Sequence, residues 1–128
     1  MIKVLPNGSL QALCVEAETK GIALSDLESI CSEFRVGPET VLNELSLTVA
    51  EGYMCGTLGY EFCDGVMNGI VNAILDLGMI GEIPHPAFAL YQAFDQGEWS
   101  RSSDSPDTDL GEKYTTPTVL EILRNLER

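Results

Sequence analysis

The sequence has few basic residues and none across its middle. Its 128 residues include 7 Lys and Arg against 20 Asp and Glu, which gives a formal net charge of −13. No Lys or Arg lies between Arg35 and Arg101. An acidic surface of this kind repels phosphate backbones, so the sequence predicts no nucleic-acid binding. It would attract a basic protein partner, although an acidic surface also keeps a protein soluble without any partner.

Motifs that bind metals or form disulfides are also absent. His85 is the single histidine. The four cysteines are spaced singly, with no CxxC pair: Cys14, Cys31, Cys55 and Cys63. Each cysteine has apolar neighbours in the sequence, where a free thiol packs as a small hydrophobic group. The acidic segment 104–112 does not match the glycine position of a calcium-binding EF-hand loop. We therefore predict reduced thiols, no metal site and no cofactor.

The chain also lacks a long hydrophobic run and the common catalytic fingerprints. The most apolar segment of the chain is interrupted by Asn72 and Asp76. At the N-terminus, the run of apolar residues stops at Pro6. We predict neither a membrane span nor a signal peptide, and therefore a cytoplasmic protein. The sequence contains no GxSxG, GxxxxGK, HExxH or GxGxxG motif, which predicts no catalytic residues. A small enzyme that uses paired carboxylates, such as Glu61 and Asp64, is the alternative.

Helical periodicity is what the sequence does show, most clearly from Tyr60 to Leu77. Seven apolar residues of this stretch recur at the spacing of one helix face: Cys63, Val66, Met67, Ile70, Val71, Ile74 and Leu77. Gly78 stands where a helix C-cap favours glycine, so the helix is predicted to end there. Gly65 and Gly69 carry no side chain, which predicts that the backbone of another helix comes close to this one.

Two stretches carry patterns that compete with a helix. Residues 1–20 are interpreted as a helix capped by Ser9, but a hairpin around residues 7–8, with Ile2 in its first strand, is the alternative. The helix predicted after Pro38 contains an alternating run that a strand would also have: Leu45, Leu47 and Val49. We prefer the helix in both places.

Further helices are predicted from local start signals. These signals are a capping box and three prolines in a first helical turn: Ser25 with Glu28, Pro38, Pro86 and Pro117. Together the patterns predict an all-α protein, a compact bundle of about six helices around a central helix 60–77. Residues 1–128 are expected to form one domain, with a mobile acidic loop near 100–116 that is rich in Ser, Asp and Pro.

A polar stripe beside the apolar face of the central helix is the first candidate for a binding surface. Its members recur every four residues: Asp64, Asn68, Asn72 and Asp76. The second candidate is a short segment in which Trp99 follows Asp95 and Glu98. An aromatic ring beside acidic residues suits an interface with a basic protein. The alternative is that the aromatic residues of this part of the chain are simply core: Phe88, Tyr91, Phe94 and Trp99. We predict that the seven residues of the two candidates bind a basic partner.

The stretch AFDQGEW at residues 93–99, with EKYT at residues 112–115, resembles short acidic bacterial proteins of uncharacterised function. Some of those proteins are similar to immunity proteins of polymorphic toxin systems. The resemblance covers residues 86–128 and implies a cytosolic, non-enzymatic inhibitor that binds one cognate toxin domain. A secretion chaperone, a class that is small, acidic and dimeric but typically α/β, is the rival binding function. The expected partner is thus a basic protein, and a homodimer is left open.

Overall fold

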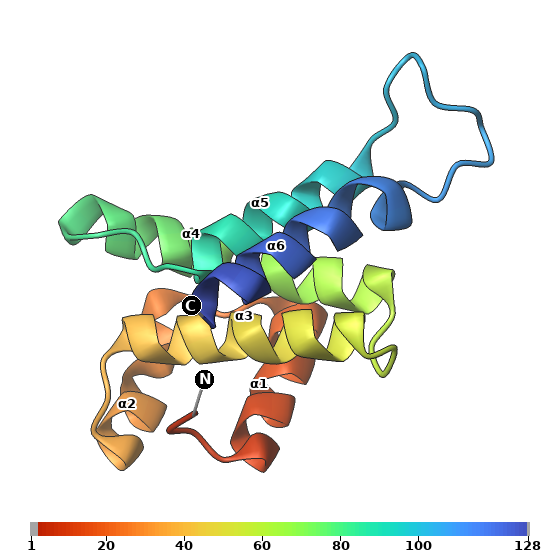
Figure 1. The fold of residues 1–128 in the computed structure, drawn as a ribbon. Coiled ribbons are helices and arrows are strands. Elements are labelled where there is room, and N and C mark those ends of the chain that lie inside the picture. Colours follow the sequence, from red (N-terminus) through yellow and green to blue (C-terminus); the bar gives the residue numbers. More distant parts are fainter. Residues whose placement is uncertain (1–2, 128) are drawn as a thin grey trace.

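Six α-helices form most of residues 3–127, the part of the chain that the computed structural model describes (Figure 1). In chain order they are α1 (Asn7–Lys20), α2 (Glu28–Phe34), α3 (Pro38–Met54), α4 (Tyr60–Ile80), α5 (Ala87–Asp95) and α6 (Thr116–Leu126). Short helical turns flank three of them: η1 (Leu24–Leu27) before α2, η2 (Gln96–Glu98) after α5 and the π-helical turn η3 (Gly111–Thr115) before α6. These residues contain no strand, so the prediction of an all-α bundle of about six helices is confirmed.

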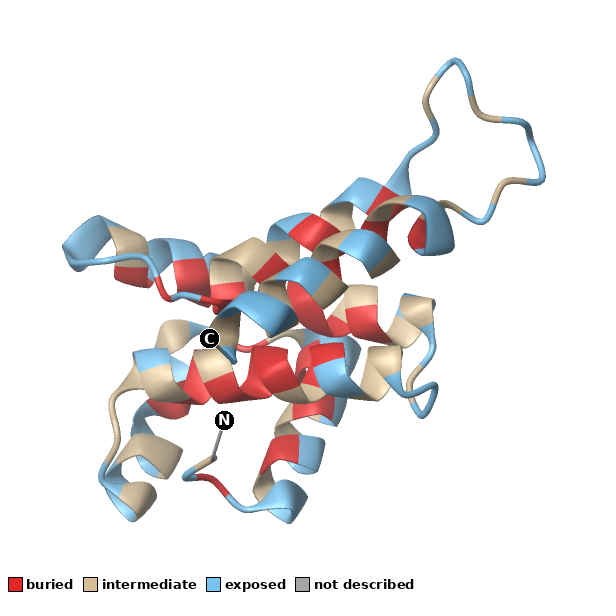
Figure 2. Cartoon of the chain, in the orientation of Figure 1, coloured by how far each residue is buried: buried red, intermediate tan, exposed pale blue. Residues whose placement is uncertain are grey.

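Helix α4 is the centre of the bundle, as predicted. It packs against α1, α3 and α5, while α6 packs against α5 and α3 (Figure 1). Six of the seven residues of the predicted apolar face are buried: Cys63, Val66, Met67, Ile70, Ile74 and Leu77. Val71 is only half-buried, and Ala73 is buried in addition. Figure 2 shows buried residues recurring along one side of each of the longer helices, as expected for amphipathic helices around a common core. The opposite side of α4 therefore remains for the polar stripe.

Length and composition alone would allow α4 to cross a membrane. Within residues 3–127 it is the one helix that is long and apolar enough, so the prediction that no segment reaches this length was wrong. In the structure one face of α4 is buried between α1, α3 and α5. In the apolar window of α4, 39% is buried inside the bundle.

Helices α1 and α4 come into backbone contact at Gly69. A Cβ atom at this position would lie 2.0 Å from the carbonyl oxygen of Ala17 on α1. The Gly69 carbonyl oxygen also accepts a hydrogen bond from the backbone N–H of Ile22, with an N···O distance of 2.8 Å. Gly65 faces only the side chain of Glu18, whose Cγ would lie 3.1 Å from an added Cβ. The predicted backbone contact is therefore found at Gly69 and not at Gly65.

The two stretches with competing patterns are both helical. Helix α1 begins at Asn7, directly after Pro6, so the predicted cap at Ser9 was wrong. The helix excludes the alternative hairpin from Asn7 onward, and Ile2, assigned to the first strand of that hairpin, lies outside the described residues. Helix α3 begins at Pro38 and continues without a break through residues 45–49, so the alternating run there is not a strand.

Two predicted helix signals act differently in the folded chain. Asp26, not Ser25, closes the turn before α2, because its Oδ2 accepts the backbone N–H of Ala23 at 2.8 Å. Gly78 does not end α4, which continues to Ile80 and is followed by Gly81. A Cβ at Gly78 would be 3.4 Å from the Ile83 side chain, which is ordinary packing contact. Nothing in the local packing therefore stops the helix at Gly78.

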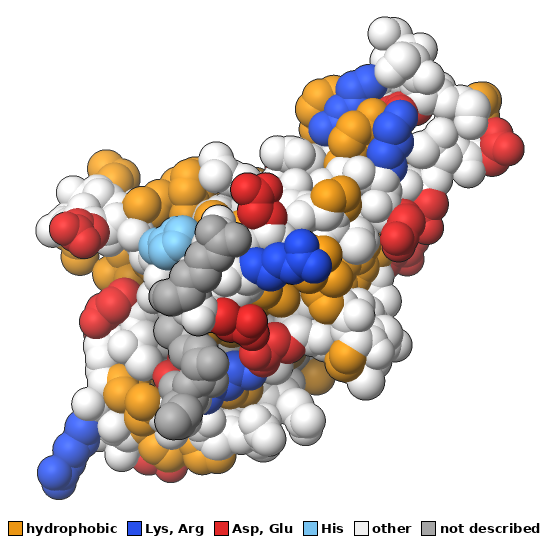
Figure 3. All heavy atoms as spheres, viewed as in Figure 1, with side chains coloured by type: hydrophobic (Ala, Val, Ile, Leu, Met, Phe, Trp, Pro, Cys, Tyr) orange, Lys and Arg blue, Asp and Glu red, His pale blue; other side chains and the backbone are white. Residues whose placement is uncertain are grey.

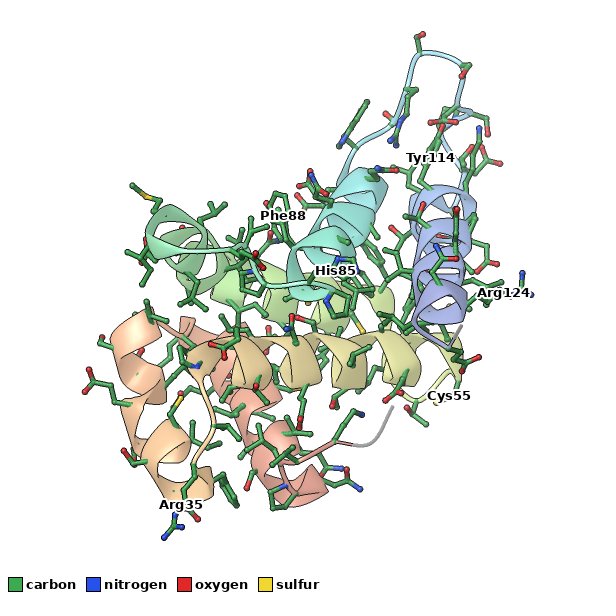
Figure 4. The ribbon with its side chains drawn as sticks, turned by 60° about the vertical axis from the view of Figure 1, so that its left-hand side comes forward. Arg35, Cys55, His85, Phe88, Tyr114 and Arg124 are labelled. Atoms are coloured by element: carbon green, nitrogen blue, oxygen red, sulfur yellow. The ribbon has the colours of Figure 1, made fainter. Side chains whose placement is uncertain are left out.

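Two residues from the middle of the chain do not lie where the sequence placed them. Glu44 belongs to the interval without Lys or Arg, which predicted an acidic surface, but its side chain is buried. Its two carboxylate oxygens accept the backbone N–H groups of Val4 and Leu5 at 2.8 and 2.9 Å. Cys55 is exposed at the end of α3 rather than among apolar neighbours (Figure 4), whereas Cys14 is buried as predicted. All four thiols are free.

A projecting loop joins η2 to η3, at the upper right of Figure 1. It is shorter than the predicted loop 100–116, because residues 111–115 already form the π-helical turn that leads directly into α6. The loop therefore returns next to the end of α5, since η3 packs against both α5 and η2. Its mobility stays a prediction.

Candidate functional site

The polar stripe of α4 meets Glu98 where the helix passes η2. The Asn68 Nδ2 atom donates a hydrogen bond to Glu98 Oε2 at 3.0 Å and lies 3.4 Å from Asp64 Oδ2. One amide group thus joins two carboxylates from separate elements of the fold. The two candidate surfaces predicted from the sequence come together here. We call Asp64, Asn68, Asp95 and Glu98 the acidic cluster.

The cluster is positioned by tight packing around Gly97, the residue before Glu98. A Cβ at Gly97 would lie 2.6 Å from the Thr115 hydroxyl oxygen and 2.7 Å from the Tyr60 hydroxyl oxygen. The Tyr60 hydroxyl donates to the carbonyl oxygen of Phe94, and the Thr115 hydroxyl donates to the backbone of α5 at 2.7 Å. Burial raises the pKa of the Tyr60 phenol. The end of α5 is therefore fixed between α4 and η3, and Glu98 is directed back toward α4.

Asp64 has an unusual proton affinity within the cluster. Burial, its hydrogen bond and charge interaction with Glu98, and the charge of Asp95 raise the pKa of Asp64 to about 7, against a weaker lowering by Asn68. Burial and the same carboxylates raise the pKa of the Tyr91 phenol on α5. The cluster thus holds more negative charge than its surroundings compensate. A cation beside it would favour the ionised form of Asp64.

Trp99 follows the cluster in the chain and is 53% exposed. The Arg101 guanidinium carbon lies 3.7 Å from the centre of the Trp99 ring and 3.5 Å from the centre of the Tyr114 ring. The same guanidinium donates to the carbonyl oxygens of Gln96 and Trp99 at 2.7 and 2.8 Å. Stacking and hydrogen bonding therefore hold the indole in place while about half of its surface stays open to solvent.

Asp104 closes the projecting loop onto its own base. Its carboxylate accepts hydrogen bonds from the Lys113 ammonium, from the Tyr114 hydroxyl at 2.8 Å and from the backbone N–H of Arg101 at 2.8 Å. The hydrogen bond from Lys113 is the main reason that the pKa of Asp104 is lowered to about 2. Tyr114 lies at the base of the loop (Figure 4). The acidic loop of the prediction is thus internally paired at its base, on the side where Trp99 stands.

The structure separates two of the seven predicted residues from the others. Asn72 is exposed beside the segment from Lys20 to Asp26, and Asp76 is exposed near η1 and α2. Both lie further along α4 than the cluster, toward its C-terminal end. The predicted residues therefore belong to two regions of the surface.

Sequence reasoning missed three residues that shape the site. Tyr60 precedes Asp64 by four residues, so the four-residue spacing of the polar stripe could have indicated it. Tyr91 was read only as a core aromatic residue. Arg101 was noted only as the end of the interval without basic residues, although its position two residues after Trp99 is compatible with stacking.

Known proteins give no independent assignment. Comparison with protein-family models, with curated proteins and with solved structures finds no match to this chain. Among residues 3–127, no group of three or more His, Cys, Asp or Glu side chains is arranged to hold a metal ion.

Proposed function

We propose that this protein is a non-enzymatic binding protein that recognises a basic protein partner through the acidic cluster and Trp99. The observation that carries the proposal is the exposed Trp99 ring, which stacks on Arg101 and directly follows the acidic cluster in the chain. The cluster contributes three carboxyl groups, those of Asp64, Asp95 and Glu98. Interface hot spots commonly combine such an anchored aromatic side chain with nearby charge. Holding the ring before binding reduces the entropy lost on association.

The two parts of the surface have different roles in this proposal. The cluster, within a protein of net charge −13, attracts a basic partner during diffusion and so increases the association rate. The exposed half of the Trp99 side chain becomes buried in the complex, where it slows dissociation. A Lys or Arg of the partner beside Asp64 would compensate the negative charge that now raises the pKa of this carboxyl group.

The partner class that we propose is a toxin domain, which would make this protein a cytoplasmic immunity protein. Small size, strong net negative charge and the resemblance of residues 86–128 to immunity-like proteins support this partner class. The rival function, a secretion chaperone, is typically α/β, and the all-helical fold counts against it.

The test begins with the tagged protein in its source cell and identification of the protein bound to it. The purified pair is then compared by stopped-flow association for wild type, for Asp95→Lys/Glu98→Lys and for the control Glu33→Lys/Glu121→Lys. Both variants change the net charge equally, and the control residues are exposed on α2 and α6. We expect a larger loss of association rate for the cluster variant, because its charges are closest to the bound partner.

Trp99→Ala should chiefly increase the dissociation rate, with a loss of about 2 kcal/mol or more for a hot spot. Association should also slow with rising salt, since the Debye length is about 10 Å at 0.1 M. Association rates that do not change with salt would contradict charge steering. Equal effects of the cluster and control variants would place the interface elsewhere.

A carboxylate-dependent enzyme is the second candidate, and one observation favours it. The pKa of Asp64 lies near 7, where a general acid or base works best, and Glu98 is its immediate neighbour. This function predicts a pH–rate profile that changes slope near pH 7 and a large loss of activity in Asp64→Asn. The binding function instead predicts that Asp64→Asn still inhibits the partner.

A further inference from the structure

A second surface lies at the other end of α4, away from the acidic cluster. A groove of about 570 Å³ runs between η1, α2, the start of α3 and α4. Its walls are mainly apolar and include Leu24, Leu27, Cys31 and Pro38. The volume lies within the range of about 300–1,000 Å³ that is usual for ligand pockets.

Exposed apolar side chains lie beyond the groove, at the end of α4. Met79 is 85% exposed and Ile80 is 78% exposed, and they follow Asp76, a residue of the groove, by three and four positions. Residues at these spacings share one side of a helix. Figure 1 shows this end of α4 extending beyond the neighbouring helices, and Figure 3 shows hydrophobic side chains gathered over it. The apolar surface therefore extends past the mouth of the groove.

All charges of the groove lining are negative. Among the described residues that line it, the charged side chains are Glu28 and Asp76, both exposed, and none is Lys or Arg. An apolar groove with carboxylates at its edge is complementary to a segment that carries apolar side chains beside basic ones. Neutral or acidic segments would leave the two carboxylates without a partner.

We propose that this groove, together with Met79 and Ile80, docks an amphipathic basic helical segment of another protein. Apolar side chains of the segment would fill the groove and cover Met79, whose flexible thioether side chain adapts to varied surfaces. Lys or Arg on the flank of the segment would pair with Glu28 and Asp76. A second copy of this chain fits less well, because a symmetric contact would bring the same acidic residues face to face.

This docking surface is separate from the proposed partner site. Asp76 follows Asp64 by 12 residues on one continuous helix, which corresponds to about 18 Å along α4. A variant at one surface therefore need not alter contacts at the other. The inference does not depend on the proposed function and can fail independently of it.

The first test uses as its probe a synthetic amphipathic helical peptide that has Leu on one face and Lys on the other. We call it the Leu/Lys peptide. Titration into the 15N-labelled protein should shift the amide signals of Leu24, Cys31, Asp76 and Ile80. Two control peptides separate the contributions: one with Ser in place of Leu and one with Glu in place of Lys. We expect binding of the Leu/Lys peptide to be at least about tenfold tighter than that of either control.

Variants at exposed positions then localise the binding. Glu28→Lys/Asp76→Lys should weaken the Leu/Lys peptide about tenfold, because two attractive contacts become repulsive. Met79→Ser/Ile80→Ser should also weaken it, whereas Asp95→Lys/Glu98→Lys, with the same charge change as the first variant, should stay within about twofold. Unchanged unfolding midpoints would show that the variants still fold.

Three results would overturn the proposal. The first is equal binding of the Ser/Lys peptide, which would mean that charge alone attracts the probe. The second is a set of shifted signals around Glu98 instead of Asp76. The third is a concentration-dependent shift of the groove signals without peptide, together with a dimer in sedimentation, which would make a second copy the occupant.

Discussion

Replacing Gly69 on α4 by alanine should destabilise the protein, although alanine is the better helix former. The reason is the backbone contact with α1, where an added Cβ would lie 2.0 Å from the Ala17 carbonyl oxygen and 2.7 Å from the carbonyl carbon. Backbone atoms cannot rotate away as the end of a side chain can. Helices α1 and α4 must therefore separate, and the hydrogen bond from Ile22 N–H to the Gly69 carbonyl oxygen must lengthen.

The expected size of the effect follows from three contributions. Helix propensity favours Ala over Gly by up to about 1 kcal/mol. Overpacking in a well-packed core costs about 1–3 kcal/mol. Weakening the Ile22 hydrogen bond costs about 1 kcal/mol more. The net result is a loss of about 1–3 kcal/mol in the free energy of unfolding, and each kcal/mol lowers Tm by about 4 °C for a domain of this size.

Thermal and urea unfolding, followed by far-UV circular dichroism, measure this loss directly. Gly65→Ala is the matched control, because it lies one turn earlier on the same helix but faces only the flexible Glu18 side chain. The unfolding midpoint of Gly65→Ala should equal or exceed that of wild type, with a gain of up to about 1 kcal/mol in the free energy of unfolding. Gly69→Leu should lose more than Gly69→Ala. A Gly69→Ala midpoint at or above that of wild type would refute the close-contact reasoning.

Three further predictions concern buried or paired carboxylates. The pKa of Asp64 is about 7 in the folded state, above its ordinary value of 3.8, so the folded protein binds this proton more tightly than the unfolded chain does. The free energy of unfolding therefore includes a stabilising contribution from Asp64 below pH 4, and this contribution is lost as pH rises from about 4 to about 7. Urea unfolding should show Asp64→Asn gaining about 1–2 kcal/mol over wild type between pH 5 and pH 8, after allowance for solvent screening. Asp104→Asn should speed amide hydrogen exchange in the projecting loop, because it weakens the bonds that close the loop. Glu44→Ala should cost about 1–3 kcal/mol by leaving the Leu5 N–H without its acceptor, whereas the exposed Glu51→Ala should cost about 0–1 kcal/mol.

The helices could be predicted because their periodicity is a property of the local sequence. Tyr60–Ile80 shows the clearest apolar repeat, and its apolar face packs against α1, α3 and α5. Helix ends were harder to predict, since local signals compete with packing. The glycine penalty at Gly78 is only about 1 kcal/mol, and the helical hydrogen bonding continues past it, since the Gly81 N–H donates to the Leu77 carbonyl oxygen at 3.0 Å. Ser25 and Asp26 are both able to cap, and only the folded backbone selects between them.

The candidate site could be predicted in its parts but not in its assembly. The four-residue spacing of α4 indicated Asp64 and Asn68, and composition indicated Glu98. Their junction depends on a bond between residues 30 positions apart, fixed by the packing around Gly97, and no local pattern encodes that distance. The raised pKa of Asp64 has the same origin, because it requires burial and a second carboxylate from another element. Asn72 and Asp76 share the spacing but lie further along α4, beside the segment from Lys20 to Asp26 and near η1 and α2.

The two surfaces on α4 are held at a fixed separation. Gly69, where α4 touches the backbone of α1, lies between Asp64 and Asp76, so the helix cannot easily bend or shift there. A partner with two basic segments about 18 Å apart could occupy both surfaces, and the second contact would then be intramolecular. In that case the losses of affinity in Glu98→Lys and Asp76→Lys would be strongly non-additive. Two separate partners would instead make each substitution affect one complex and leave the other unchanged.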